Sequence, residues 1–155
     1  WLKGLSPKQN REIPELNYDR VYQLKNDFPD LEIVINGGIS SIEDSINHLK
    51  VLDGVMVGRE AYTNPYLLAE VDQKIYGQDK PIIKREEIAE KFCEYIDNEM
   101  RKGTKLHSMT RHMLGLFREV KGAKQFRRYL SENAYSENAS IDVLYNALSK
   151  TEGAT

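Results

Sequence analysis

The stretch Leu31-Glu32-Ile33-Val34-Ile35-Asn36-Gly37-Gly38 contains a short β-rich run, Leu31 to Ile35, that ends in an Asn-Gly-Gly turn. A second apolar run, Gly54-Val55-Met56-Val57, ends in Gly58-Arg59. Neither run alternates between apolar and polar residues, which is typical of parallel strands buried on both faces. Apolar residues at helical spacing predict helices over 18–28 and 41–51. The order helix, strand, helix, strand therefore predicts an α/β fold with parallel strands.

Two parallel strands do not form a stable sheet alone, because both faces and both edges need cover. We therefore expect this α/β part to be incomplete and the chain to be a piece of a larger protein. The first residues, Trp1 to Gly4, contain neither a start methionine nor the apolar core of a signal peptide.

The texture of the sequence changes near residue 77. Gly77 to Pro81 has the composition of a linker, and the remainder has the periodicity of helices. The predicted helices are 84–101, 105–117, 123–133 and 140–150, with Ser140 as an N-cap. The predicted division is 1–76 for the α/β part, 77–83 for the linker, 84–150 for the helical domain and 151–155 for a frayed tail.

The composition is that of a globular protein. Of the 155 residues, 40% are hydrophobic and 30% charged, and no apolar run approaches the ~20 residues of a membrane helix. The single cysteine, Cys93, has no partner for a disulfide and no Cys or His at metal-ligand spacing. We expect a cytoplasmic location, no metal site and no membrane partner, with Cys93 in a helical core.

Basic residues are concentrated in one segment. Between Arg101 and Arg128 there are nine Lys and Arg but one acid, Glu119, so this segment carries a net charge of +8. Such a segment is a candidate surface for a polyanion. The alternative is that these are solvated faces of ordinary helices, whose acidic complement lies elsewhere in the chain.

The glycine-rich turns after the two strands suggest a phosphate site. In a (β/α)₈ barrel the loops after strands seven and eight commonly bind phosphate through backbone N–H groups. The candidate residues are Asn36, Gly37, Gly38, Gly58 and Arg59. The alternative is that the glycines serve only the turns.

Five strings carry a family resemblance. They are Gly4-Leu5-Ser6-Pro7-Lys8-Gln9-Asn10-Arg11-Glu12-Ile13-Pro14, Ile35-Asn36-Gly37-Gly38-Ile39, Asp53 to Tyr62, Thr110-Arg111-His112-Met113-Leu114-Gly115-Leu116-Phe117 and Arg127 to Asn133. Over residues 1 to about 150, the chain resembles the bacterial A type of tRNA-dihydrouridine synthases. That resemblance implies the last two strands of an FMN-binding TIM barrel followed by a helical bundle that binds tRNA.

The resemblance also implies roles for residues. FMN phosphate would be held by Asn36, Gly37, Gly38, Gly58 and Arg59, and tRNA by Lys8, Arg11, Lys124 and Arg127. Lys124 stands where an Arg also occurs in the family, so charge is kept but fork geometry is lost.

The family's chemistry implies residues that this chain lacks. NADPH reduces the flavin, FMN delivers hydride to C6 of uridines 20 and 20a, and an acidic cysteine protonates C5. That cysteine precedes this chain, so we assign no catalytic residue here and expect the chain alone to be inactive. The alternatives are a stand-alone RNA-binding module and a barrel enzyme acting on a small phosphorylated metabolite.

Histidines and tyrosines add little at this level. His112 is interpreted as a packed or capping residue rather than an RNA contact. Tyr62, Tyr66 and Tyr129 could stack on bases, but half-buried packing is the preferred interpretation.

Overall fold

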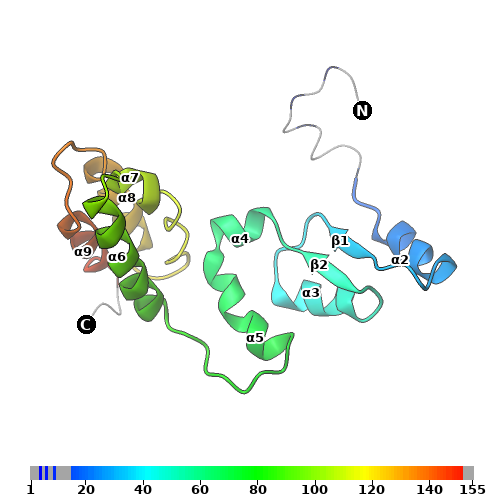
Figure 1. The fold of residues 1–155 in the computed structure, drawn as a ribbon. Coiled ribbons are helices and arrows are strands. Elements are labelled where there is room, and N and C mark those ends of the chain that lie inside the picture. Colours follow the sequence, from blue (N-terminus) through cyan, green and yellow to red (C-terminus); the bar gives the residue numbers. More distant parts are fainter. Residues whose placement is uncertain (1–3, 5, 7–8, 10–14, 152–155) are drawn as a thin grey trace. The chain divides into compact units, whose positions relative to one another are not determined.

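The structure is a computed structural model that describes all residues except 1–3, 5, 7–8, 10–14 and 152–155. The chain divides into two compact units, 1–58 and 59–155. Figure 1 shows the α/β elements of the first unit and the helices of the second.

The first unit has the predicted helix-strand-helix-strand order. Its elements are α2 (Tyr18–Asp27), β1 (Val34–Asn36), α3 (Ile42–Leu49) and β2 (Gly54–Met56). The strands pair in parallel, with Val34 opposite Gly54 and Asn36 opposite Met56. The predicted parallel pair with a helix between its strands is therefore confirmed, although both strands are shorter than predicted.

Side-chain caps and one ion pair hold the ends of these elements. Ser41 Oγ accepts a hydrogen bond from the Asp44 N–H at 2.9 Å, as expected at a helix N-terminus. The same Ser41 hydroxyl is the main reason that the pKa of Asp44 is lowered. Before β2, the Asp53 carboxylate accepts from the Ile33 N–H at 2.8 Å and pairs with Lys25 Nζ at 2.8 Å. Asp53 thus ties α2 to the entrances of both strands.

The α/β core is small. Ile35, Ile39 and Leu52 form its buried cluster, and partly buried side chains of α2 and the strands pack against them. His48 is also buried, with Nδ1 2.7 Å from the Tyr22 hydroxyl oxygen. Val34 and Met56, one on each strand, remain 51% and 53% exposed.

The second unit is helical. Its elements are α4 (Arg59–Thr63), the 3₁₀ helix η1 (Pro65–Glu70), α5 (Val71–Lys74), α6 (Arg85–Arg101), α7 (Leu106–Thr110), α8 (Ala123–Asn133) and α9 (Asp142–Leu148). Side chains from α6 to α9 and from the turns after α7 fill one core. Phe117 and Phe126 meet edge to face at its centre, with ring centroids 5.0 Å apart.

One predicted helix is wrong over half its length. The helix predicted over 105–117 ends at Thr110, and the chain continues in turns from residue 111 to 122. These turns bring Gly115 so close to α4 that a Cβ there would collide with the carbonyl oxygen of Thr63. The turn approaches the backbone of α4 more closely than a helix with side chains would allow.

Two further differences concern boundaries. The helix predicted from Ser140 begins at Asp142, so Ile141 and not Ser140 is its N-cap residue, although Ser140 Oγ accepts from the Asp142 N–H at 3.2 Å. The contact-defined boundary lies between Gly58 and Arg59 rather than near residue 77, because α4 is bonded to the helical unit, for example by Glu60 to Arg118. The segment 77–83 as the linker of the complete protein stays a prediction.

Candidate functional site

The first predicted glycine loop follows β1 directly. Because β1 and β2 are parallel and Asn36 is opposite Met56, the loops after both strands leave the same edge of the sheet. Gly37 and Gly38 have φ angles of 118° and 68°, a region that favours glycine. The Tyr18 hydroxyl donates to the Gly37 carbonyl oxygen at 2.7 Å, which fixes the loop. The loop therefore has a bent, glycine-dependent backbone, and bent backbones of this kind occur in anion-binding turns.

The second loop differs in what its glycine is needed for. A Cβ built on Gly58 has no described atom within 4 Å, and the φ of Gly58 is not positive. Neither conformation nor packing within the described residues therefore requires glycine there. Close approach of a ligand would require it. Arg59, the next residue, is exposed and begins α4 in the second unit.

The basic segment separates into paired and unpaired cations. Acids outside the segment pair with Arg101 (Asp97, 2.5 Å), Lys102 (Glu99, 2.7 Å), Arg118 (Glu60, 2.8 Å) and Arg128 (Glu132, 2.7 Å). Within the part of the chain that the structure describes, no side-chain partner is found for Lys105, Arg111, Lys124 or Arg127. The predicted acidic complement therefore exists, but it leaves part of the segment uncompensated.

Helix α8 positions two of the predicted tRNA residues. Lys124 and Arg127 are three residues apart and exposed, whereas Phe126 and Leu130 on the same helix are buried in the core. The core thus holds the helix while two cations face solvent. Lys8 and Arg11 lie outside the described residues.

The aromatic residues are not all alike. Tyr66 is half-buried, donates to the Ile83 carbonyl oxygen at 3.0 Å and lies under the Arg85 guanidinium, so its interpretation as packing is confirmed. Tyr129 is also half-buried, with Lys150 Nζ 4.6 Å from its ring centroid. Tyr62 is 57% exposed, and its hydroxyl lies 3.1 Å from Nδ1 of His112.

His112 is more exposed than the predicted packed or capping residue of a helix would be, although its ring does pack against Tyr62. His112 is exposed in the turn after α7, and its ring meets Tyr62 edge to face at 5.9 Å. The helix predicted over 105–117 included His112, whereas the residue lies in a turn.

Cys93 is a core residue, as predicted. It is 2% exposed in α6, and burial, with a smaller effect from Glu90, raises its pKa to about 11. A thiol of this kind is a weak acid and a poor nucleophile at neutral pH. Among the described residues there is no cluster of His, Cys, Asp and Glu suited to a metal, and no helix there could cross a membrane.

Comparison with known proteins gives the family of this chain. The profile of the family described as Dihydrouridine synthase (Dus) matches residues 2–152. The tRNA-dihydrouridine(20/20a) synthase of Vibrio cholerae serotype O1 is 56% identical over 150 residues, which cover 97% of this chain and 46% of the relative. The proteins of the same name from Shewanella oneidensis (57% over 144 residues) and Escherichia coli (55% over 148) are covered over 43% of their length, by 93% and 96% of this chain.

The match leaves much of each relative uncovered. The chain spans less than half the length of these curated relatives, while nearly all of its own residues align with them. Sequence identity above 50% over nearly the whole chain, together with the match to the family profile, shows common ancestry with these proteins. The chain belongs to the dihydrouridine synthase family.

Proposed function

We propose that the complete protein is a flavin-dependent oxidoreductase that reduces uridine to 5,6-dihydrouridine at positions 20 and 20a in the D-loop of tRNA. The observation that carries the proposal is the 56% identity, over 97% of this chain, to a tRNA-dihydrouridine(20/20a) synthase. The glycine loops of the α/β unit and the unpaired cations of the helical unit support it independently.

In this proposal, residues 1–76 are the C-terminal part of a (β/α)₈ barrel and β1 and β2 are its last two strands. The exposure of Val34 and Met56 supports it, because neighbouring strands and barrel-filling side chains would cover them. Residues 84–150 are the helical tRNA-binding domain, joined by the linker 77–83.

The described loops fit the phosphate end of FMN. Gly37 and Gly38 have positive φ angles, as in anion-binding turns. At Gly58 no described atom lies within 4 Å of the position that a Cβ would take, which leaves room for a ligand. We assign the phosphate end to Asn36, Gly37, Gly38, Gly58 and Arg59. When bound, FMN supplies hydride for C6 of the uracil ring, with NADPH as the source of electrons. In this proposal an acid outside this chain protonates C5, and Cys93 is not that acid, because it is buried and has a raised pKa.

The tRNA contacts in this proposal are Lys8, Arg11, Lys124 and Arg127. Contacts to phosphates orient a folded RNA without reading its sequence. Orientation matters here because the target base must leave its stack to reach the flavin.

The flavin assignment is tested on the complete gene product. Purified protein should show flavin absorbance and release FMN on denaturation, and it should form dihydrouridine in unmodified tRNA with NADPH, as detected by mass spectrometry. Arg59→Gln should weaken FMN binding, whereas the matched control Arg20→Gln, another exposed arginine, should not. Colourless protein that gains no FMN on reconstitution would overturn the flavin function; if it still bound tRNA, an RNA-binding module would be favoured.

The tRNA assignment is tested by charge removal on α8. Lys124→Gln combined with Arg127→Gln should weaken tRNA binding and reduce its dependence on salt. Lys91→Gln is the matched control, because Lys91 is exposed on α6 but paired with Glu87 at 3.0 Å. Unchanged affinity and salt dependence in the double variant would remove the assignment from this helix.

A further inference from the structure

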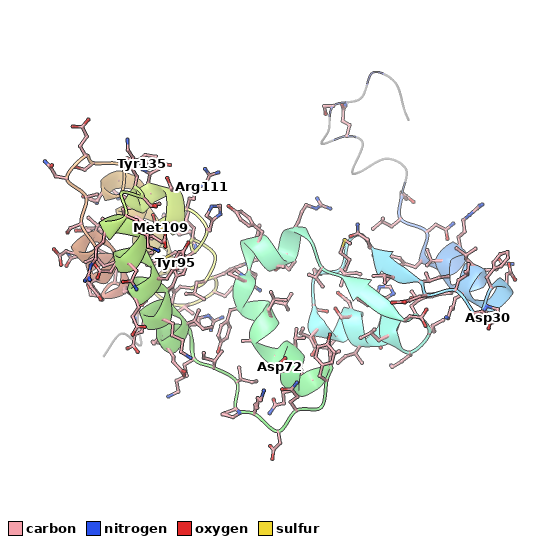
Figure 2. All side chains as sticks on the ribbon, viewed as in Figure 1. Asp30, Asp72, Tyr95, Met109, Arg111 and Tyr135 are labelled. Atoms are coloured by element: carbon pink, nitrogen blue, oxygen red, sulfur yellow. The ribbon has the colours of Figure 1, made fainter. Side chains whose placement is uncertain are left out.

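A hollow of about 510 Å³ lies within the helical unit, beside the cations of α8. Its lining comes from α4, the turns after α7, and α8. The lining residues are Tyr62, Thr63, Arg111, His112, Leu114, Gly115, Arg118 and Arg127. Three of these are arginines, and none is acidic. Arg111, labelled in Figure 2, belongs to the turn that follows α7 and is exposed.

Specific contacts hold the walls of the hollow together. Gly115 permits the turn to approach the Thr63 carbonyl, where any larger residue would collide. Two side-chain contacts also join α4 to the turns after α7. The His112 ring contacts Tyr62, and Arg118 pairs with Glu60 at 2.8 Å. The two walls are therefore bonded to each other through Tyr62 and His112 and through Glu60 and Arg118.

The charges around the hollow are not balanced. Arg118 is neutralised by Glu60, with Glu119 3.5 Å away. Arg111 and Arg127 have no ion-pair or hydrogen-bond partner for their side chains among the residues that the structure describes. Two guanidinium groups thus face one hollow with no anion from the described chain. Arginine's planar fork suits phosphate oxygens, which it can bind with two parallel hydrogen bonds.

We propose that this hollow is a subsite for the phosphodiester backbone of the bound RNA, with Arg111 as a phosphate-binding residue together with Arg127. The inference rests on the proposed function and adds to it a residue and a location. Lys124, one helical turn before Arg127, extends the positive surface beyond the hollow, as a continuous strand requires. Tyr62 and Leu114 give the hollow an apolar wall that suits a ribose or base.

The test measures tRNA binding by the complete gene product at several salt concentrations. Arg111→Ala should weaken binding by about tenfold. The negative slope of log K against log salt should become shallower by about 0.7 to 0.9, because one phosphate contact is lost. Arg111→Lys should keep the slope, because charge is retained, but recover only part of the affinity. The matched control is Arg101→Ala, because Arg101 is exposed in the same unit but paired with Asp97.

The outcomes are distinct. If Arg111→Ala binds with the affinity and slope of Arg101→Ala while Lys124→Gln and Arg127→Gln weaken binding, the subsite is overturned and the proposed function stands. If the unmodified protein shows no salt-dependent affinity for tRNA, both fail. A lowered thermal unfolding midpoint in Arg111→Ala with an unchanged salt slope would mean a structural role and would also overturn the subsite.

Discussion

The two units bury their apolar residues to different extents. In the helical unit, α6 to α9 enclose a core that includes Ile96, Phe117 and Phe126, each 1% exposed or less. In the α/β unit the buried cluster is Ile35, Ile39 and Leu52, while Val34 and Met56 on the same two strands are more than half exposed. The helical unit is therefore complete as a hydrophobic core, and the α/β unit is not.

This difference separates the two proposed binding functions. Lys124 and Arg127 lie on α8, whose apolar face is buried in the core of the helical unit. Their positions therefore depend on residues 59–155 alone. The glycine loops stand at the end of a two-stranded sheet whose outer edges and faces need further strands. The part of the RNA-binding surface on α8 should thus be retained by residues 59–155 alone, although Lys8 and Arg11 belong to the other unit, whereas FMN binding should not be retained by residues 1–58 alone.

The largest expected effect is a difference between the units made separately. Residues 59–155 should unfold in one cooperative transition, because one packed core links α6 to α9, while Tyr66 of η1 packs against it and Glu60 of α4 pairs with Arg118. Residues 1–58 should show no such transition, because two short strands and a small buried cluster do not offset the conformational entropy lost on folding. Thermal unfolding followed by circular dichroism measures both. A cooperative transition in 1–58 would contradict the comparison.

A single substitution tests the core of the helical unit. Phe126→Ala removes a fully buried ring that meets Phe117, so the free energy of unfolding of 59–155 should fall by about 3 to 5 kcal/mol. Denaturant unfolding gives this value. The control is Gln125→Ala, an exposed neighbour on α8 that should change it by less than about 0.5 kcal/mol. A loss below about 1 kcal/mol in Phe126→Ala would show a loosely packed core.

The spacing of apolar residues predicted the helices whose apolar face alone determines their bounds. Helix α8 has the predicted bounds, 123–133, and α2 ends one residue earlier than predicted. The turns after α7 could not be predicted, because Met113, Leu116 and Phe117 are buried at helix-like spacing. These turns include the close approach of Gly115 to Thr63, a contact between segments far apart in the sequence.

The candidate site shows the same limit. The pair Arg128 and Glu132 has the i,i+4 spacing, whereas Lys124 and Arg127 have no acid three or four residues away, so their unpaired state was predictable. The pairing of Arg118 with Glu60, 58 residues apart, was not. The sequence therefore did not predict that Arg111 and Tyr62 line one hollow, although both lie in family strings.

A smaller effect should distinguish this chain from the complete protein. Met56→Ala removes a side chain that is 53% exposed here. The free energy of opening that amide exchange reports at Ile35 and Val55 should therefore change by less than about 0.5 kcal/mol in this chain. In the complete protein, where barrel neighbours would cover Met56, the same substitution should cost about 2 kcal/mol or more. Gln23→Ala, exposed on α2, is the control for both. Equal costs in the two proteins would contradict the incomplete-barrel interpretation.

The smallest effect concerns the ion pair that holds the α/β unit. The hydrogen bond from Lys25, followed by that from the Ile33 N–H, lowers the pKa of Asp53 below its value in the unfolded chain. A lowered folded-state pKa means that the stabilisation is present above the unfolded pKa of about 3.9 and is lost as pH falls through the folded value. Amide protection at Ile33 and Ile35 should therefore decrease below about pH 4.

In Asp53→Asn, which keeps an acceptor for the Ile33 N–H but loses the charge, protection should be lower at neutral pH and fall less on acidification. Asp44 also has a lowered pKa in this unit, so the difference between wild type and Asp53→Asn isolates the Lys25 pair. Parallel pH profiles in the two proteins would mean that the ion pair contributes nothing to the strand entrances.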